Sequence, residues 1–128
     1  MIRNLLIQHP YKFAILWALI IFGLCSTPGR FIPTTSWLEL LSFDKWVHAS
    51  IFFVLVILFA LAISIHKQNS NLIYLTIVLA IAYGGLLEIM QAKVFSERSG
   101  DWLDFIANSF GCLMALIFYK KVIKLIVR

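Results

Sequence analysis

Ionisable and amide side chains gather in two short groups at the edges of long apolar stretches. The first group is Asp44, Lys45 and His48, and the second is Glu88, Gln91, Arg98, Asp101, Asp104 and Asn108. An ionisable side chain costs about 2.5–3.5 kcal/mol at the centre of a bilayer and less near its surface. Several such groups at matching depths therefore predict one shared site. Acid–base catalysis would suit His48, Glu88 and Asp104, because imidazole titrates near neutral pH and carboxylates in unlike surroundings can divide the two roles.

The composition indicates that these groups belong to a membrane protein. The chain has 128 residues, of which 62% are hydrophobic and only 13% are charged, whereas a soluble domain has about 25% charged residues. We predict a single integral membrane domain over residues 1–128. The formal net charge is +5, but the basic residues flank apolar segments, where they set topology and meet anionic lipid. Nucleic acid is therefore not an expected partner.

Four apolar segments are long enough to carry the polar groups across a bilayer. They cover about residues 10–26, 46–65, 72–91 and 102–119, which is close to the length that a helix needs for ~30 Å of hydrocarbon. The expected fold is all-α, a bundle of four transmembrane helices. Asn71 and Ser99 are the expected N-caps of the last two helices. An aromatic belt is expected from Trp37, Trp46 and Trp102, and residues 37–41 could lie in the interface plane.

The distribution of charge predicts the orientation of this bundle. With four spans, seven basic residues share the side of both termini: Arg3, Lys12, Lys67, Lys120, Lys121, Lys124 and Arg128. Four lie on the other side: Arg30, Lys45, Lys93 and Arg98. The excess places both termini in the cytoplasm. All six acids then fall on the outward half: Glu39, Asp44, Glu88, Glu97, Asp101 and Asp104.

Helical rise brings the polar groups to one level. His48, Glu88 and Asp104 each lie about one turn inside the outer end of their segment. Spacings of three, four and seven residues put Asp44 with His48, Glu88 with Gln91, and Asp101 with Asp104 and Asn108 on common faces. These faces should converge, because polar groups that faced lipid would have no partners. Arg98 is expected to pair with Glu88 or Asp104, and the small residues Ala107, Gly111 and Ala115 should let helices approach closely.

The ordered motifs resemble the VanZ-like family of small bacterial membrane proteins, named after a teicoplanin-resistance protein. The match spans about residues 40–115: Asp44-Lys45-x-x-His48, Tyr83-Gly84-x-x-x-Glu88-x-x-Gln91, and Arg98-Ser99-x-x-x-x-Asp104-x-x-x-Asn108-x-x-Gly111. Ala115 departs from the pattern, since members often carry a second glycine there. The resemblance implies a multi-pass protein of the bacterial inner membrane, and it allows a role in glycopeptide resistance. Families of this build have been suggested to act on lipid head groups or lipid-linked envelope precursors.

Three functions remain open from the residues. The first is an enzyme on phosphate-bearing or other anionic lipid head groups, with His48, Glu88 and Asp104 as catalytic residues and Arg98 and Lys45 holding the anion. The other expected substrate-binding residues are Asp44, Gln91, Asp101 and Asn108. The second function is a non-catalytic binding or structural module. The third is a divalent-metal site built from the catalytic set, but no HExxH-type spacing supports it, so no metal or cofactor is predicted. Membrane lipids or a lipid-linked precursor are the expected partners, and the sequence points to no protein partner.

Overall fold

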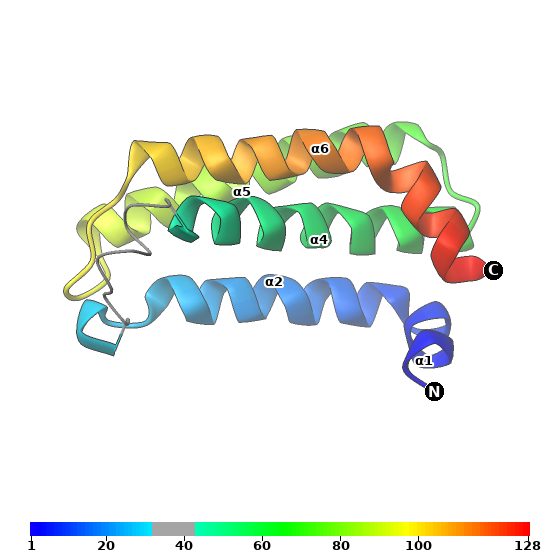
Figure 1. The fold of residues 1–128 in the computed structure, drawn as a ribbon, viewed down its shortest axis with the longest axis horizontal. Coiled ribbons are helices and arrows are strands. Elements are labelled where there is room, and N and C mark those ends of the chain that lie inside the picture. The colour runs from blue at the N-terminus through cyan, green and yellow to red at the C-terminus, as the bar shows by residue number, and fades with distance from the viewer. Residues whose placement is uncertain (32–42) are drawn as a thin grey trace.

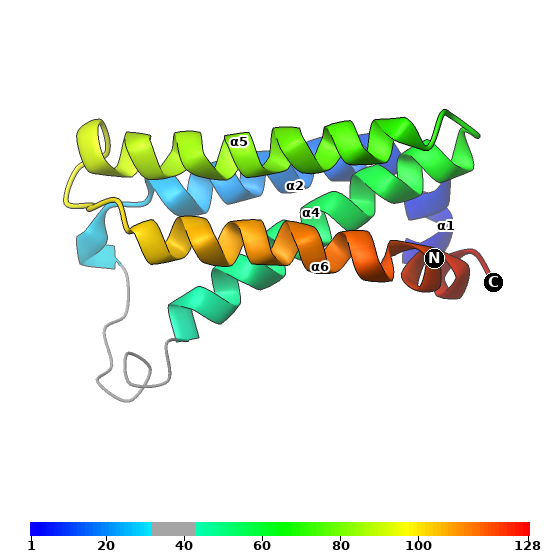
Figure 2. The same cartoon turned by 90° about the horizontal axis from the view of Figure 1, so that it is seen from above.

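The computed structural model describes residues 1–31 and 43–128, and all regular structure in these ranges is helical. Its elements are α1 (Ile2–Gln8), α2 (Pro10–Ser26), the short 3-10 helix η1 (Gly29–Phe31), α4 (Phe43–Ile65), α5 (Asn71–Lys93) and α6 (Trp102–Val127). The four longer helices run side by side along the molecule (Figure 1). Seen from above, α4 crosses α6 obliquely while α2 and α5 run nearly parallel to each other (Figure 2). The all-α prediction is confirmed; the interface segment expected at residues 37–41 lies outside the described residues.

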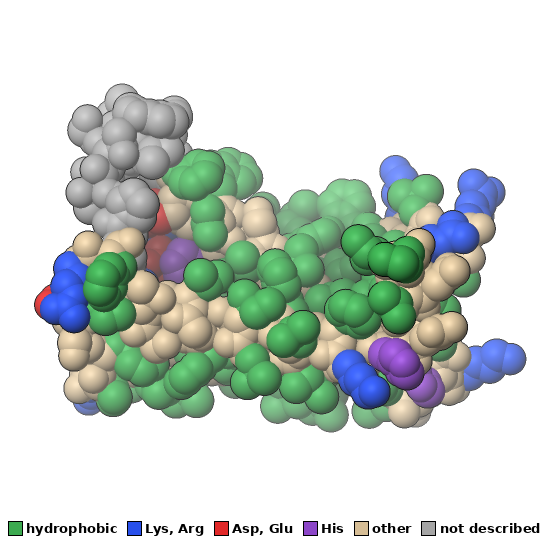
Figure 3. Space-filling model, turned by 90° about the horizontal axis from the view of Figure 1, so that it is seen from below, with side chains coloured by type: hydrophobic (Ala, Val, Ile, Leu, Met, Phe, Trp, Pro, Cys, Tyr) green, Lys and Arg blue, Asp and Glu red, His purple; other side chains and the backbone are tan. Residues whose placement is uncertain are grey.

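Two of the helices are long and apolar enough to cross a membrane. These are α4 and α5, and α1 with α2 would add a third span if the pair, bent by 101° between them, counts as one. Large apolar side chains such as Leu19, Val78 and Ile117 are at least 62% exposed, and on one face they cover the middle of the molecule between ends that carry Lys and Arg (Figure 3). Several polar side chains are buried instead, those of Glu88, Gln91, Asp104 and Asn108. This inverted distribution fits a bundle whose solvent is lipid.

Helix boundaries follow the sequence signals closely, with two exceptions. Pro10 opens α2 at its first turn, where its missing N–H costs no hydrogen bond. The separate helix α1 before it was not predicted, and α6 continues to Val127, well past the expected end near residue 119. Helix length at this end follows the good helix formers Lys120, Lys121 and Lys124 and not the thickness of a bilayer.

Both predicted N-caps are wrong. Asn71 is the first residue of α5, and its backbone N–H donates to the side-chain oxygen of Asn69 at 2.9 Å. At α6 the cap is Asp101, whose carboxylate accepts from the Leu103 N–H at 2.8 Å. Asp is as good an N-cap as Ser, and Asp101 directly precedes the helix, whereas Ser99 stands two residues earlier.

Helices α4 and α6 approach each other closely at a glycine. A Cβ atom on Gly111 would collide with the Ala49 backbone, 2.8 Å from its carbonyl carbon and even closer to its oxygen. Ala115, one turn further along α6, is fully buried. The expected role of small residues in close helix packing is confirmed for the contact between α4 and α6. The approach also sets the register of α4 against α6, and this register positions the polar groups at one end.

The turn after α4 contains a lysine in the left-handed backbone conformation. Lys67 has φ = 51°, and the N–H groups of Lys67 and Gln68 donate to the carbonyls of Ser64 and Ile63, which is a Schellman motif. Because glycine adopts this left-handed conformation without steric cost, Lys67→Gly should raise the free energy of unfolding by about 1 kcal/mol. Denaturant titration in micelles measures the change. Lys67→Ala, which removes the charge but keeps the strain, is the control and should give no gain.

Candidate functional site

Three helices deliver their polar side chains to one end of the bundle. The start of α4, the end of α5 and the start of α6 meet at this end, whereas both chain termini and the turn between α4 and α5 lie at the other (Figures 1 and 2). One ligand-type atom each from His48, Glu88 and Asp104 lies within 4.8 Å of the other two. The structure thus brings together the three residues for which the sequence suggests catalysis. Their catalytic role remains a prediction.

Lys45 is the centre of a cluster of carboxylates. Its Nζ lies 2.7 Å from Asp44, 2.6 Å from Asp101 and 2.5 Å from Asp104. The hydrogen bond from Lys45 and the N–H of Leu103 hold the pKa of Asp101 below its ordinary value of 3.8. The ammonium group therefore links the first turns of α4 and α6. With three acceptors it has all the hydrogen bonds that it can donate.

His48 lies between an amide and a carboxylate of α6. Its Nδ1 is 3.0 Å from the side-chain oxygen of Asn108, and its Nε2 is 3.4 Å from Oδ2 of Asp104. An amide oxygen only accepts hydrogen bonds, so Nδ1 carries a proton in this arrangement. Nε2 is then the nitrogen that can gain or lose a proton, and it faces Asp104. The pair Asn108–His48 fixes the imidazole as a base-orienting group would.

Glu88 is the most enclosed carboxylate of the site. Its residue is only 8% exposed, and Oε2 accepts from the backbone N–H of Asp101 at 3.0 Å. Oε1 is buried and accepts no hydrogen bond from the described residues. Such an orphaned acceptor costs about 1–3 kcal/mol. Glu88 therefore combines one structural contact, to the cap of α6, with one oxygen that has unused bonding capacity.

Gln91 and Arg98 depart from the expected arrangement. Gln91, 1% exposed, turns toward α2 and donates from Nε2 to the carbonyl of Cys25 at 3.1 Å. Within residues 1–31 and 43–128, Arg98 forms no ion pair, and its buried Nε has no hydrogen-bond partner. The expected pairing of Arg98 with Glu88 or Asp104 is therefore wrong for the described part of the chain. Glu88 satisfies one oxygen with a backbone N–H instead, and Asp104 is held by Lys45.

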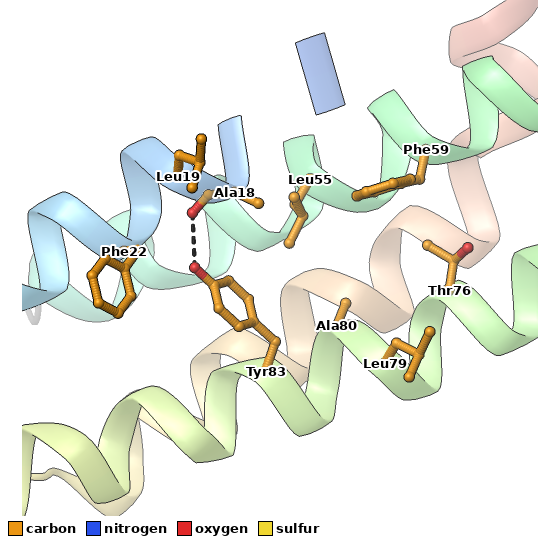
Figure 4. A pocket seen from close by; sticks show the side chains of 9 residues that line it. All are labelled: Ala18, Leu19, Phe22, Leu55, Phe59, Thr76, Leu79, Ala80 and Tyr83. Atoms are coloured by element: carbon orange, nitrogen blue, oxygen red, sulfur yellow. Dashed lines mark hydrogen bonds between the residues drawn. The ribbon is translucent and has the colours of Figure 1, made fainter. Parts of the chain in front are cut away.

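An apolar cavity, which sequence reasoning missed, lies among α2, α4 and α5. Its volume is about 400 Å³, and apolar side chains line it, among them Leu19, Phe22, Leu55 and Phe59 (Figure 4). The hydroxyl of Tyr83 donates to the Ala18 carbonyl at 2.7 Å across the gap between α2 and α5 (Figure 4). Tyr83 directly precedes Gly84, whose missing side chain leaves room for Asn108. The cavity begins at Tyr83, five residues before Glu88 on α5, and at Leu55, seven residues after His48 on α4.

A second missed contact holds the loop between α5 and α6. Glu97 has φ = 56° and accepts from the backbone N–H of Arg30 at 3.2 Å, while the two side chains pair at 3.6 Å. Only the acid at position 97 was visible in the sequence, since its partner lies 67 residues away. The contact holds the loop against η1 at the polar end of the bundle.

The geometry is that of a polar cluster at one end of a small helical membrane protein with two to three candidate spans. Its groups could move protons, hold a cation or bind a head group. Comparison with known proteins adds nothing to this description, because no protein-family model, no curated protein and no solved structure matches the chain.

Proposed function

We propose that the chain is a VanZ-like protein of the bacterial inner membrane with four spans, both termini in the cytoplasm and its polar site in the outer leaflet. The fourth span is α6, which packs along α4 and buries Asp104 and Asn108. A helix with such side chains is stable in lipid only if they face the bundle. The excess of basic residues at the end that carries both termini supports the orientation.

The level of the site supports a lipid head group as its substrate. Trp46 in the first turn of α4 and Trp102 at the start of α6 are 66% and 71% exposed at the polar end. Exposed tryptophans favour the depth of the head groups. His48 lies two residues after Trp46 and Asp104 two residues after Trp102, or about 3 Å of helical rise. A lipid phosphate at this depth is within reach of the imidazole.

The chemistry that we propose is hydrolysis or transfer at a lipid head-group phosphate or at a lipid-linked envelope precursor. The observation that carries it is His48, which is oriented by Asn108 and faces Asp104 beside the enclosed Glu88. His48 acts as the general base toward water or a substrate hydroxyl, and Glu88 or Asp104 protonates the leaving oxygen. Arg98, whose guanidinium forms no ion pair within residues 1–31 and 43–128, holds a phosphate oxygen. The apolar cavity among α2, α4 and α5 offers room for an acyl chain.

Variants at the proposed acid and base test this function. His48→Ala and Glu88→Gln should each lower activity by about 100-fold or more, because positioned acid–base groups contribute about 10²–10⁴ in rate. The assay is mass spectrometry of head groups after incubation of the purified protein with vesicles of bacterial lipids, and with lipid-linked precursors. Ser109→Ala is the matched control on α6, since its hydroxyl bonds only to the Phe105 carbonyl of the same helix. If the head groups were the same with and without the native protein on every substrate, catalysis would be disproved.

A non-catalytic module is the second candidate, and the Lys45 cluster favours it. The ammonium joins Asp44 of α4 to Asp101 and Asp104 of α6, which is an arrangement that clasps two helices without any reaction. If the site is only a clasp, His48→Ala and Glu88→Gln should lower thermal stability and membrane abundance together. If the site is catalytic, the thermal stability and membrane abundance of these variants should stay near the native level while the activity is lost.

A further inference from the structure

We propose that His48, Glu88 and Asp104 bind a divalent cation of the zinc or manganese kind. The polar end contains two groups of ligand-type atoms within 4.8 Å of one another. One group, formed by Asp44, Asp101 and Asp104, surrounds the ammonium of Lys45 and so has its cation within the chain. The other group is His48, Glu88 and Asp104, and the chain places no ammonium or guanidinium within ion-pair distance of Glu88 in the described residues.

The contacts of His48 favour a cation at this second group. Nδ1 is held by the Asn108 oxygen, so the lone pair of Nε2 in the neutral ring points toward Oδ2 of Asp104 at 3.4 Å. A lone pair and a carboxylate oxygen repel each other unless a proton or a metal ion lies between them. A metal-bound histidine usually donates its other ring N–H to a carbonyl or carboxylate, as His48 does to Asn108. Two ligands of a tetrahedral ion at metal–ligand distances of 2.0–2.2 Å stand about 3.4 Å apart.

The carboxylates have the capacity that this ion requires. Asp104 divides its two oxygens, since Oδ1 bonds to Lys45 and Oδ2 faces His48. Glu88 is more than nine-tenths buried, and one of its oxygens has no hydrogen-bond partner among residues 1–31 and 43–128. One imidazole nitrogen and two carboxylates suit borderline ions, and a set of three protein ligands leaves positions open.

The negative charge of the site indicates what a bound ion would do there. The site holds four carboxylates and one lysine ammonium, so its formal charge is −3 with neutral His48; the carboxylates are those of Asp44, Glu88, Asp101 and Asp104. A phosphate would be repelled by such a cluster. A divalent ion reduces the charge to −1 and offers its open positions to a phosphate oxygen. When Nε2 binds the ion, His48 has no ring nitrogen left to act as a base, and a water on the ion would take that role in the function proposed above, on which this part of the inference rests. Metal binding itself is tested apart from that function.

Metal binding can be measured on the complete protein in micelles. After removal of metals with a chelator, titration with Zn²⁺ and with Mn²⁺ should give one tight ion per chain and a rise in the melting temperature. Glu88→Gln and His48→Gln should weaken binding at least 100-fold, and Asn108→Ala by about 10–100-fold through the orientation of the ring. Asp44→Asn, which belongs to the Lys45 group, should retain stoichiometric binding.

A spectroscopic readout keeps the test decisive if a variant folds poorly. Pulsed EPR of the Mn²⁺-loaded native protein should show modulation from one imidazole nitrogen, and this signal should vanish in His48→Gln. Absence of saturable binding, or binding equal in native protein and Glu88→Gln, would overturn the proposal. If the protein bound metal but formed no lipid product, the enzymatic function would be refuted and the proposed metal site would still be supported. Full activity after removal of metals would overturn the role of the ion.

Discussion

Gly111→Ala is expected to destabilise the protein by about 3 kcal/mol, although it adds a single methyl group. The new Cβ would meet the backbone of Ala49, whose carbonyl carbon lies 2.8 Å away. Backbone cannot swing aside as a flexible side chain does, so α4 and α6 must separate. The separation would also pull His48 from Asn108 and Lys45 from Asp101, because these pairs join the same two helices.

The matched control is Gly23→Ala in α2, where a Cβ atom meets nothing within 4 Å. At this position the substitution should stabilise the protein by up to about 1 kcal/mol through helix propensity. Unfolding in mixed micelles, followed by circular dichroism, measures both values. The expected changes have opposite signs. An equal response at both glycines would contradict the close approach of α4 and α6.

Lys45→Met should have a comparable effect through electrostatics. Removal of one partner from a buried ion pair costs about 3–5 kcal/mol; the side chains of Asp44 and Asp101 are 55% and 41% exposed, so we expect about 3 kcal/mol. The loss arises because Asp101 and Asp104 remain next to each other without a countercharge. Lys93→Met, an exposed lysine at the end of α5, is the control and should be neutral within about 0.5 kcal/mol.

The free energy of unfolding that Lys45→Met removes should depend on pH in one direction. Asp101 has a lowered pKa in the folded protein, so its stabilisation is complete above its ordinary value of 3.8 and is lost as the pH falls through the folded value. The difference in free energy of unfolding between the native protein and Lys45→Met should therefore be constant from about pH 7 to 5 and become smaller below pH 3.8. If this difference in free energy of unfolding stayed constant into strong acid, Lys45 would act through packing and not through the carboxylates.

The helices could be read from local signals. Pro10 marks the start of α2 and Pro28-Gly29 its end, and the structure places this helix at Pro10–Ser26 as expected. The level of His48, Glu88 and Asp104 follows from helical rise alone, which is why their proximity was predictable. The caps were missed because Ser99 and Asn71 have the same local preference for the N-cap position as the observed caps, Asp101 and Ser70.

The pairing within the site was less accessible from the sequence. The link of Lys45 to Asp101 and Asp104 depends on the register of α4 against α6, which the contact at Gly111 fixes. Gln91 shares a helical face with Glu88, yet it bonds to Cys25 of α2 because the end of α5 lies between two neighbours. Such choices belong to tertiary packing, and spacing within one helix does not encode them.

The Lys45 cluster also has a consequence for biogenesis. Asp104 follows Lys45 by 59 residues, so a ribosome completes α4 and α5 before the acids that neutralise the lysine are made. Until then Lys45 and His48 have only the adjacent Asp44 as an acidic neighbour on their own helix. The nascent chain must keep this end of α4 near water or inside the insertion machinery, and release into lipid has to wait for α6. A chain truncated before Asp101 should therefore be a substrate for membrane quality-control proteases.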